Sequence, residues 1–344
     1  MAVGALTTLP ASWYTDPAIL RLEQERIFRR GWQYVARADE VAEPRAYVAA
    51  RVGDVPVVVL RDDEGELRGF VNVCRHRGHE VVSGSGKRAA LQCPYHAWTY
   101  GLDGRLRAAP RSEREPGFSL EGVALAPVAV EEWGPWVFAN SDVDAAPLAE
   151  TLGDLPDRFG VPFDRLRFHQ RSEWTVEANW KVVAENFLEC YHCAVAHPGF
   201  SAVVDVSQDA YRLSSEGLVL SQHAVLRDGA AEVDGEFHLI WPNTVINVMP
   251  GRPNVSIGPI VPAGPGRAAR FLDYWVDAEA DEAWVAELMA FDTQVGVEDE
   301  ALVESVQRGL ASGQVDRGRL LPESEQLIVA FEALVERALG DVAS

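Results

Sequence analysis

The chain has 344 residues, with 31 basic and 52 acidic side chains and a net charge of −21. Its length suits one large domain or two ordinary ones, and its hydrophobic share of 47% is normal for a globular protein. The negative charge argues against nucleic acid and anionic membrane surfaces as partners. Because residues 1–13 lack the features of a signal peptide and no apolar run reaches the length of a membrane span, we expect a cytoplasmic protein.

The first predicted element is a helix that begins near Pro17 and is followed by an aromatic segment up to Arg37. Its inward residues should be Ile19, Leu22, Ile27 and Trp32, with charged residues between them. From Tyr47 to about Phe138, short runs rich in valine and aromatic residues alternate with turn signals such as Gly84-Ser85-Gly86. This pattern predicts an all-β module, which we place at residues 38–145, inside a larger part made of residues 1–37 and 146–344.

The β module contains two short metal-binding motifs. Cys74-Arg75-His76 is followed, sixteen residues later, by Cys93-Pro94-Tyr95-His96. Thiolates bind iron–sulfur clusters or zinc, and a Rieske centre takes two Cys on one iron and two His on the other. Zinc fingers instead pair Cys with Cys and His with His, so one Cys and one His per loop favour a Rieske [2Fe–2S] cluster. We interpret His79 as a surface or interface residue near the cluster edge, because Cys-x-His already supplies an imidazole from this loop.

A helical pattern within residues 176–196 suggests a second metal site. Its apolar stripe consists of Trp180, Val183, Ala184, Phe187 and Tyr191. Glu185, Glu189 and His192 form a separate polar face. His197 precedes Pro198, which disfavours the α conformation at residue 197, so we expect the helix to end there and His197 to turn back towards His192. Two imidazoles and one carboxylate form the open iron site of non-haem Fe(II) oxygenases.

The helix predicted over residues 280–309 offers the carboxylate. Asp299 falls on its apolar stripe, where a carboxylate is costly to bury unless it is paired or bound to metal. Asp292 lies on the same flank and is the competing candidate, and Asp299 could equally cap a helix or form an ion pair.

Cys190 and Cys193, which flank His192, permit a redox or zinc CxxC site. Without a second Cys pair, we expect both to be buried structural thiols.

The strands predicted between residues 211 and 276 should wall a substrate pocket. Candidate wall residues are Phe237, Trp241, Asn247, Tyr274 and Trp275. These aromatic residues could form a cage for a quaternary ammonium group, and aromatic substrates would use similar walls. Each could also simply belong to the aromatic core of a sheet, and the sequence leaves these interpretations open.

Taken together, the motifs resemble the catalytic α subunit of Rieske non-haem iron oxygenases over about residues 9–310. The resemblance lies in the two Cys/His loops, the N-W-K…E-N…E-x-x-H-x4-H segment that begins at Asn179, and the late Glu298-Asp299 pair. Within this family the chain is most similar to the branch of carnitine, choline and glycine-betaine monooxygenases. That likeness lies in Glu189, in Cys190-Tyr191-His192 and in the helix at 297–310.

The resemblance implies an α+β fold in which the Rieske domain is inserted in a catalytic domain with a central antiparallel sheet flanked by helices. It implies a [2Fe–2S] cluster on Cys74, His76, Cys93 and His96, and a mononuclear Fe(II) on His192, His197 and Asp299. It also implies a homotrimer in which the cluster of one subunit faces the iron of its neighbour. Glu189 would bridge a cluster histidine and His192 across that interface, at a position where many ring-dihydroxylating members have Asp.

The implied activity is that of a terminal oxygenase. It would use O2 and electrons from an NAD(P)H-dependent reductase or ferredoxin to hydroxylate or oxidatively dealkylate a small organic substrate, a quaternary ammonium compound being one candidate. The alternatives are an aromatic ring-hydroxylating dioxygenase and, in another class, an electron-transfer protein with an inactive second site. The complete set of Glu189, His192, His197 and Asp299 favours an oxygenase over the electron-transfer protein.

Overall fold

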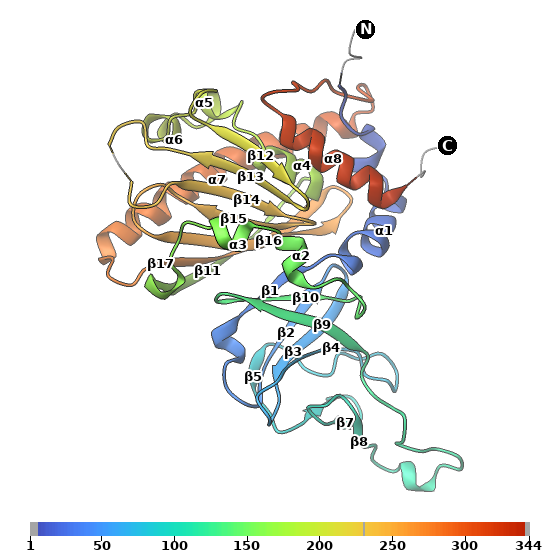
Figure 1. Cartoon of the computed structure of the whole chain (residues 1–344). Helices are drawn as coiled ribbons and strands as arrows, with labels where there is room; N and C mark the ends of the chain where they lie inside the picture. Colours follow the sequence, from blue (N-terminus) through green and yellow to red (C-terminus); the bar gives the residue numbers. More distant parts are fainter. Residues whose placement is uncertain (1–5, 230, 341–344) are drawn as a thin grey trace. The chain divides into compact units, whose positions relative to one another are not determined.

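The computed structural model describes residues 6–229 and 231–340. The chain forms two compact units, one at Phe28–Leu148 and the other combining Met1–Ile27 with Ala149–Ser344 (Figure 1). The first is the predicted β module, but it starts earlier than residue 38. Strand β1 (Gln33–Arg37) pairs with β10 (Trp136–Asn140), so residues that we assigned to the larger part belong to the β sheet. No helix of the described ranges is long and apolar enough to cross a membrane.

The β unit consists of two antiparallel sheets. The seven-stranded sheet has the order β1-β10-β9-β4-β3-β2-β5, and the small sheet has the order β6-β7-β8. The remaining strands are β2 (Ala46–Val52), β3 (Val55–Arg61), β4 (Leu67–Val71), β5 (Ser85–Lys87), β6 (Leu91–Gln92), β7 (Thr99–Tyr100), β8 (Leu106–Ala108) and β9 (Pro127–Trp133). The valine run of β3 is buried in its centre, as expected for β-branched residues between packed neighbours. A separate apolar cluster, which includes Tyr100 and Leu91, surrounds Cys74 and Cys93.

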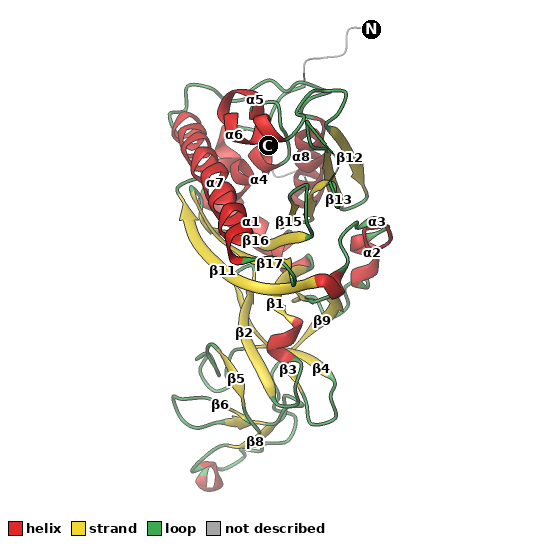
Figure 2. Cartoon of the chain, turned by 90° about the vertical axis from the view of Figure 1, so that its left-hand side faces the viewer, coloured by secondary structure: helices red, strands yellow, loops and turns green. Residues whose placement is uncertain are grey.

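The catalytic unit is built on a second seven-stranded antiparallel sheet with the order β11-β17-β16-β15-β14-β13-β12. Its strands are β11 (Leu166–Val176), β12 (Arg212–Glu216), β13 (Val219–Ala224), β14 (Gly235–Ile240), β15 (Thr244–Val248), β16 (Asn254–Gly264) and β17 (Arg267–Asp277). Helices α4 (Trp180–Phe187), α7 (Glu282–Ala311) and α8 (Gln326–Leu339) lie over one face of this sheet (Figure 2). The predicted α+β fold with a central antiparallel sheet flanked by helices is confirmed.

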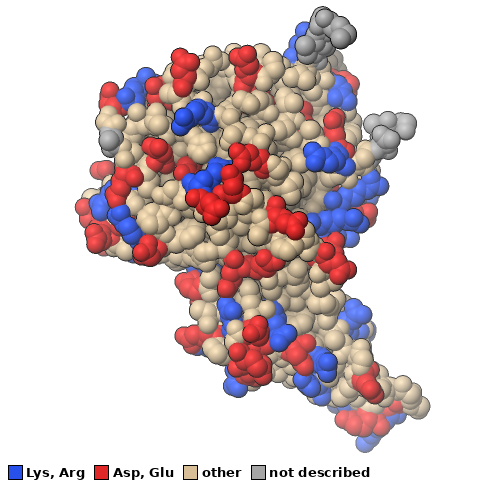
Figure 3. All heavy atoms as spheres, viewed as in Figure 1, with Lys and Arg blue, Asp and Glu red and all other residues tan. Residues whose placement is uncertain are grey.

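Several shorter helices complete the chain. They are α1 (Pro17–Arg26), α2 (Leu148–Leu152), α3 (Leu155–Arg158), α5 (Cys193–Ala196) and α6 (Pro198–Val203), with 3-10 turns at Ala11–Tyr14, Phe28–Arg30, Ala38–Val41, Ser112–Arg114 and Phe163–Arg165. Acidic and basic side chains are interspersed over the face shown in Figure 3, and the described residues form no broad basic patch on that face. This agrees with the net charge of −21.

The N-terminal segment contributes charge, as well as apolar residues, to the core. Helix α1 is capped by Asp16, whose carboxylate accepts the amide N–H of Ala18. Glu23 of α1 is fully buried and pairs with Lys181 of α4, while its other oxygen accepts the indole N–H of Trp180 at 2.9 Å. Periodicity alone could not reveal this carboxylate as inward-facing, because its partners lie more than 150 residues away.

The predicted helix at 176–196 is broken into shorter pieces. Helix α4 is capped by Asn179 and ends at Phe187, and α5 and α6 follow after a turn. The break changes the direction of the side chains, so two predicted positions are wrong. Tyr191 is exposed rather than part of the apolar stripe. Glu185 does not share a face with Glu189, because it is half-buried and turned towards Tyr14, whose hydroxyl hydrogen it accepts at 2.7 Å.

Candidate functional site

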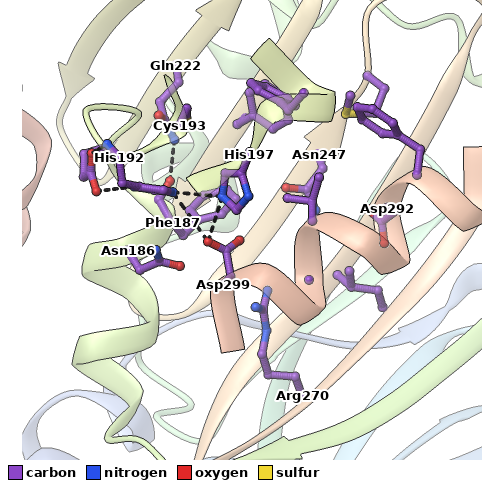
Figure 4. A pocket seen from close by; sticks show the side chains of 18 of the residues that line it. Asn186, Phe187, His192, Cys193, His197, Gln222, Asn247, Arg270, Asp292 and Asp299 are labelled. Atoms are coloured by element: carbon purple, nitrogen blue, oxygen red, sulfur yellow. Dashed lines mark hydrogen bonds and ion pairs between the residues drawn. The ribbon is translucent and has the colours of Figure 1, made fainter. Parts of the chain in front are cut away.

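Three side chains from separate elements converge on one point in the catalytic unit. His192 lies between α4 and α5, His197 precedes Pro198 at the start of α6, and Asp299 lies in the middle of α7. His197 Nε2 is 3.1 Å from His192 Nε2 and 3.0 Å from Asp299 Oδ1, and His192 Nε2 is 3.5 Å from the same oxygen (Figure 4). The three donor atoms lie within 4.8 Å of one another. Their convergence agrees with the predicted turn at Pro198.

The electrostatics of this cluster favour a bound cation. Burial raises the pKa of Asp299, but hydrogen bonds with His192 and His197 outweigh it and lower the pKa to about 2. Burial lowers the pKa of His192, yet hydrogen bonds with Asp299 and Glu189 raise it to about 9. The carboxylate is therefore ionised, and it attracts positive charge to the point where two imidazole nitrogens also meet. A divalent metal supplies that charge, and two imidazoles with one carboxylate are the donor set of non-haem iron sites.

A glutamate contacts the Nδ1 atom of each of the two imidazoles, while their Nε2 atoms face the metal cluster. Glu189 Oε1 contacts His192 Nδ1, and Glu298 Oε2 lies 2.8 Å from His197 Nδ1. The other oxygen of Glu298 accepts a hydrogen bond from Gln294 at 3.1 Å. A carboxylate on Nδ1 fixes the tautomer and turns Nε2 towards the metal. The sequence analysis named Glu298 only as the neighbour of Asp299 and missed this role, for which that position was the available signal.

The turn that carries Glu189 and His192 is closed by a disulfide between Cys190 and Cys193. The prediction of two structural thiols is therefore wrong. The helix break after Leu188 places the two Cα atoms 4.9 Å apart, within the range that a disulfide bridges. Cys193 is buried against Phe200 and Phe237, so the bond anchors the turn to the core.

A second group of metal-binding side chains lies in the β unit. Cys74 and Cys93 are buried and form no disulfide, whereas His76 and His96 are exposed with ring centroids 4.6 Å apart. Gly78 has a φ of +78°, and its amide donates to the Cys74 carbonyl, which folds the first loop back on itself. Burial raises the pKa of the Cys93 thiol, so a thiolate there requires a metal. Two inner thiols beneath two outer imidazoles fit a Rieske cluster.

The third histidine of this region and the competing aspartate have other partners. His79 is exposed, contacts the Glu80 carbonyl through Nδ1, and lies 5.8 Å from the ring of Tyr95. Asp292 is two helical turns from Asp299, and its Oδ2 accepts the hydroxyl hydrogen of Tyr274. Asp292 therefore lies outside the three-residue metal cluster.

A cavity of about 140 Å³ opens onto the metal cluster. Its aromatic wall consists of Trp174, Phe187, Phe200, Tyr211, Phe237 and Phe291, and its polar groups include Asn186, Gln222, Asn247, Arg270 and Asp292. Phe237 and Asn247, two of the predicted wall residues, line this cavity. Trp241 does not line this cavity, because its ring packs on Phe331 of α8 at 5.9 Å.

Comparison with known proteins identifies the family. Residues 163–341 match the ring hydroxylating alpha subunit (catalytic domain), and residues 31–128 match the Rieske [2Fe-2S] domain. The carnitine monooxygenase oxygenase subunit of Acinetobacter pittii is 34% identical over 95% of this chain and 94% of its own length. The chain belongs to the Rieske non-haem iron oxygenases, as a catalytic α subunit.

Other relatives of this oxygenase agree. The chloroplastic choline monooxygenase of Arabidopsis thaliana is 34% identical over 91% of this chain and 78% of its own length. A crystal structure of the quaternary ammonium Rieske monooxygenase CntA with L-carnitine has a TM-score of 0.86, at 32% identity over 98% of this chain and 96% of that chain. Naphthalene 1,2-dioxygenase from Rhodococcus sp., at 20% identity and a TM-score of 0.80, shares the fold.

The family fixes the cofactors of this oxygenase, and the residues present fit them. It carries a Rieske [2Fe–2S] cluster and a mononuclear iron, and it depends on an electron donor and O2. The predicted cofactors and the predicted class of enzyme are thus confirmed. The two buried thiols with paired imidazoles suit the cluster, and the two imidazoles converging on an ionised carboxylate suit the mononuclear iron.

Proposed function

We propose that this oxygenase hydroxylates a small quaternary ammonium compound at a carbon close to the nitrogen, with or without loss of an alkyl group. The observation that carries the proposal is the aromatic cavity that opens onto the metal cluster. Aromatic faces attract an ammonium group that has no N–H to donate. The carboxyl of Asp292 lies beside Phe291 in the same wall and adds an acceptor of positive charge. The names of the relatives, carnitine and choline monooxygenases, point to the same substrate class.

We assign the mononuclear iron to His192, His197 and Asp299, and the cluster to Cys74, Cys93, His76 and His96. The cluster supplies electrons and the iron activates O2. The protein residues position these groups: Glu189 and Glu298 hold the two imidazoles, and the aromatic walls exclude water from the substrate. One experiment tests the ligand assignment. Asp299→Ala should lose the mononuclear iron and keep the visible spectrum of the cluster, whereas Asp292→Asn should keep both; equal iron loss in the two variants would contradict it.

We further propose that the oxygenase works as a homotrimer supplied by an NAD(P)H-dependent reductase or a ferredoxin, and that Glu189 carries the electron path between subunits. The contact of Glu189 with His192 Nδ1 and the exposure of His76 and His96 support this proposal. A CntA structure is described in terms of inter-subunit electron transfer. Glu189→Gln should retain both metal centres but turn over far more slowly; unchanged turnover would exclude this role.

Product analysis tests the substrate class. The purified oxygenase with a surrogate reductase should consume O2 in step with product when given choline, glycine betaine or carnitine, and products should be identified by mass. The same assay with benzoate and naphthalene tests aromatic ring hydroxylation, which no specific contact in the cavity favours. A cis-diol from an aromatic compound, with no product from any quaternary ammonium compound, would replace the proposal with that alternative.

A further inference from the structure

Arg270 is a charged side chain in the cavity wall that has no hydrogen-bonding partner among the described residues. It lies on β17 opposite Trp174 of β11, on the sheet face that also presents Leu272 to the cavity. Its guanidinium carbon is 5.2 Å from the centre of the Trp174 ring. Its Nε is buried without a hydrogen-bond partner, and among the described residues the guanidinium forms no hydrogen bond or ion pair.

Three other arginines on or beside this sheet are paired. Arg171 forms a two-point contact with Asp273, Arg165 binds Asp277, and Arg267 on the same strand binds Glu177. Arg270 is half-buried, and its Nε is fully buried without an acceptor. Burying an N–H donor without an acceptor is unfavourable, because the donor loses its water and gains no hydrogen bond in return. Arg270 differs from these three in that its Nε is buried without a partner among the described residues, while its side chain faces the cavity.

The carboxylates of Asp299 and Asp292 attract Arg270, but they do not accept a hydrogen bond from it. Arg270 extends towards α7, between Asp299 and Asp292 (Figure 4). Asp299 is directed to the two imidazoles, and Asp292 is bonded to Tyr274. With iron on Asp299, that carboxylate is neutralised further, and the positive charge of Arg270 is balanced even less.

The positive charge of Arg270 limits which quaternary ammonium compounds the cavity can bind. A quaternary ammonium group and a guanidinium in one small cavity repel each other unless a negative charge accompanies them. The aromatic rings gather around Phe200, 6.2 Å from Phe237 and 6.3 Å from Phe291, whereas Arg270 lies beside Trp174. The cavity thus offers one region for an ammonium group and a separate cationic group for an anion.

We propose that Arg270 binds a carboxylate of the substrate, so that the oxygenase selects zwitterionic quaternary ammonium compounds over the corresponding alcohols. Arginine presents two parallel N–H donors that match the two oxygens of a carboxylate. The inference rests on the proposed function, since it names which quaternary ammonium compounds the site takes. Arg270 is a specificity-determining residue, and it contacts the carboxylate of the substrate rather than its quaternary ammonium group.

The test compares matched substrates on the complete oxygenase with its reductase. Glycine betaine is paired with choline, and γ-butyrobetaine with its four-carbon alcohol, which differ in the carboxylate. The wild type should favour the zwitterion of at least one pair. Arg270→Gln should lower kcat/KM for that zwitterion by about 10- to 100-fold and change kcat/KM for the alcohol by no more than about twofold. Arg270→Lys keeps the charge but not the two parallel donors. Its kcat/KM for the zwitterion should lie between that of the wild type and that of Arg270→Gln.

Arg267→Gln is the matched control, because Arg267 lies on the same strand and pairs with Glu177 at the surface. Its kcat/KM values for the zwitterion and for the alcohol should equal those of the wild type. Iron content and the cluster spectrum show whether each variant retains its metals. A parallel fall for zwitterion and alcohol in Arg270→Gln would mean a structural role near Asp299 and overturn the inference. Equal use of both substrates by the wild type would overturn it while leaving the proposed function intact, and no turnover of any quaternary ammonium compound would remove both.

Discussion

At the scale of single residues, the metal cluster depends on side chains that do not touch the metal. His197 is buried, and its Nδ1 faces Glu298, which is itself held by Gln294 one turn earlier on α7. His192 has the corresponding contact with Glu189. Each histidine is therefore fixed at both ring nitrogens. This leaves the Nε2 atoms little freedom and explains how short, separate segments hold three donors together.

The Glu298 contact leads to the first prediction. Glu298→Gln removes the negative charge behind His197, and it should weaken binding of the mononuclear iron by about 10- to 100-fold without altering the cluster. Iron retained after dialysis against a chelator measures this effect, and the visible spectrum reports the cluster. Glu287→Gln on the exposed side of the same helix is the control. Equal iron retention in the two variants would show that Glu298 does not support the site.

The elements around the site show where sequence patterns succeed. The Cys-x-His and Cys-x-x-His loops, the turn at His197-Pro198 and the carboxylate at Asp299 could all be predicted, because each depends on local spacing or on a single helix face. The antiparallel sheets followed from alternating apolar runs and turn residues. Such local signals suffice to name the residues that converge.

The remaining features depend on contacts between distant segments. Glu185 has the periodicity of a surface residue, yet it is half-buried, bonds to Tyr14 and lies close to the charge of Glu332. Trp241 was assigned to the pocket, but α8 covers it. Nothing local in the sequence distinguishes Arg270 from Arg171 or Arg267, because the distinction is that no described residue accepts a hydrogen bond from its Nε. The disulfide was missed because the pattern was extended as one helix through residue 188.

At the element scale, the disulfide predicts how the turn between α4 and α5 behaves. Reducing the Cys190–Cys193 bond should lower the free energy of unfolding by about 2 kcal/mol, since the bond closes a very short loop. It should also loosen Glu189 and His192, and so weaken iron retention. Chemical unfolding and iron release, with and without reductant, measure both effects.

The Cys190→Ser/Cys193→Ser variant provides the control for the same experiment. It should resemble the reduced wild type and should not respond to reductant. If reductant lowers stability and iron retention in the double variant as much as in the wild type, the effect arises at the cluster, whose Cys74 and Cys93 are unchanged, and not at the disulfide.

At the scale of the whole molecule, one half-buried and one buried carboxyl, those of Glu185 and Glu332, tie the N-terminal segment to helices α4 and α8. The Tyr14 hydroxyl lies 2.7 Å from Glu185 and 3.2 Å from Glu332, and it can donate its hydrogen to only one of them. Burial and the charge of Glu332 raise the pKa of Glu185 to about 8, and burial raises that of Glu332 to about 7. At neutral pH the group therefore retains at least one carboxyl proton.

This group makes stability depend on pH. Glu185 binds its proton more tightly in the folded state than in the unfolded chain, where its pKa is near 4.5. The free energy of unfolding should therefore fall as pH rises from about 4.5 to about 8, and level off above that. Glu185→Gln should remove roughly 1–3 kcal/mol of this fall. Urea unfolding at pH 5 and at pH 8.5 measures it, with Glu287→Gln as the control that should follow the wild type.

The division of the chain has a consequence for its synthesis. The β unit is continuous in sequence, but the catalytic unit needs both ends of the chain, since Leu9 and Tyr14 bond to Glu332. At about 5–20 residues per second, the first segment waits roughly 15–60 s for α8 to leave the ribosome. We predict that nascent chains ending near residue 200 already protect the β unit from protease while residues 6–27 remain cleavable. The electron-accepting half would then be complete before the oxygen-activating half begins to close.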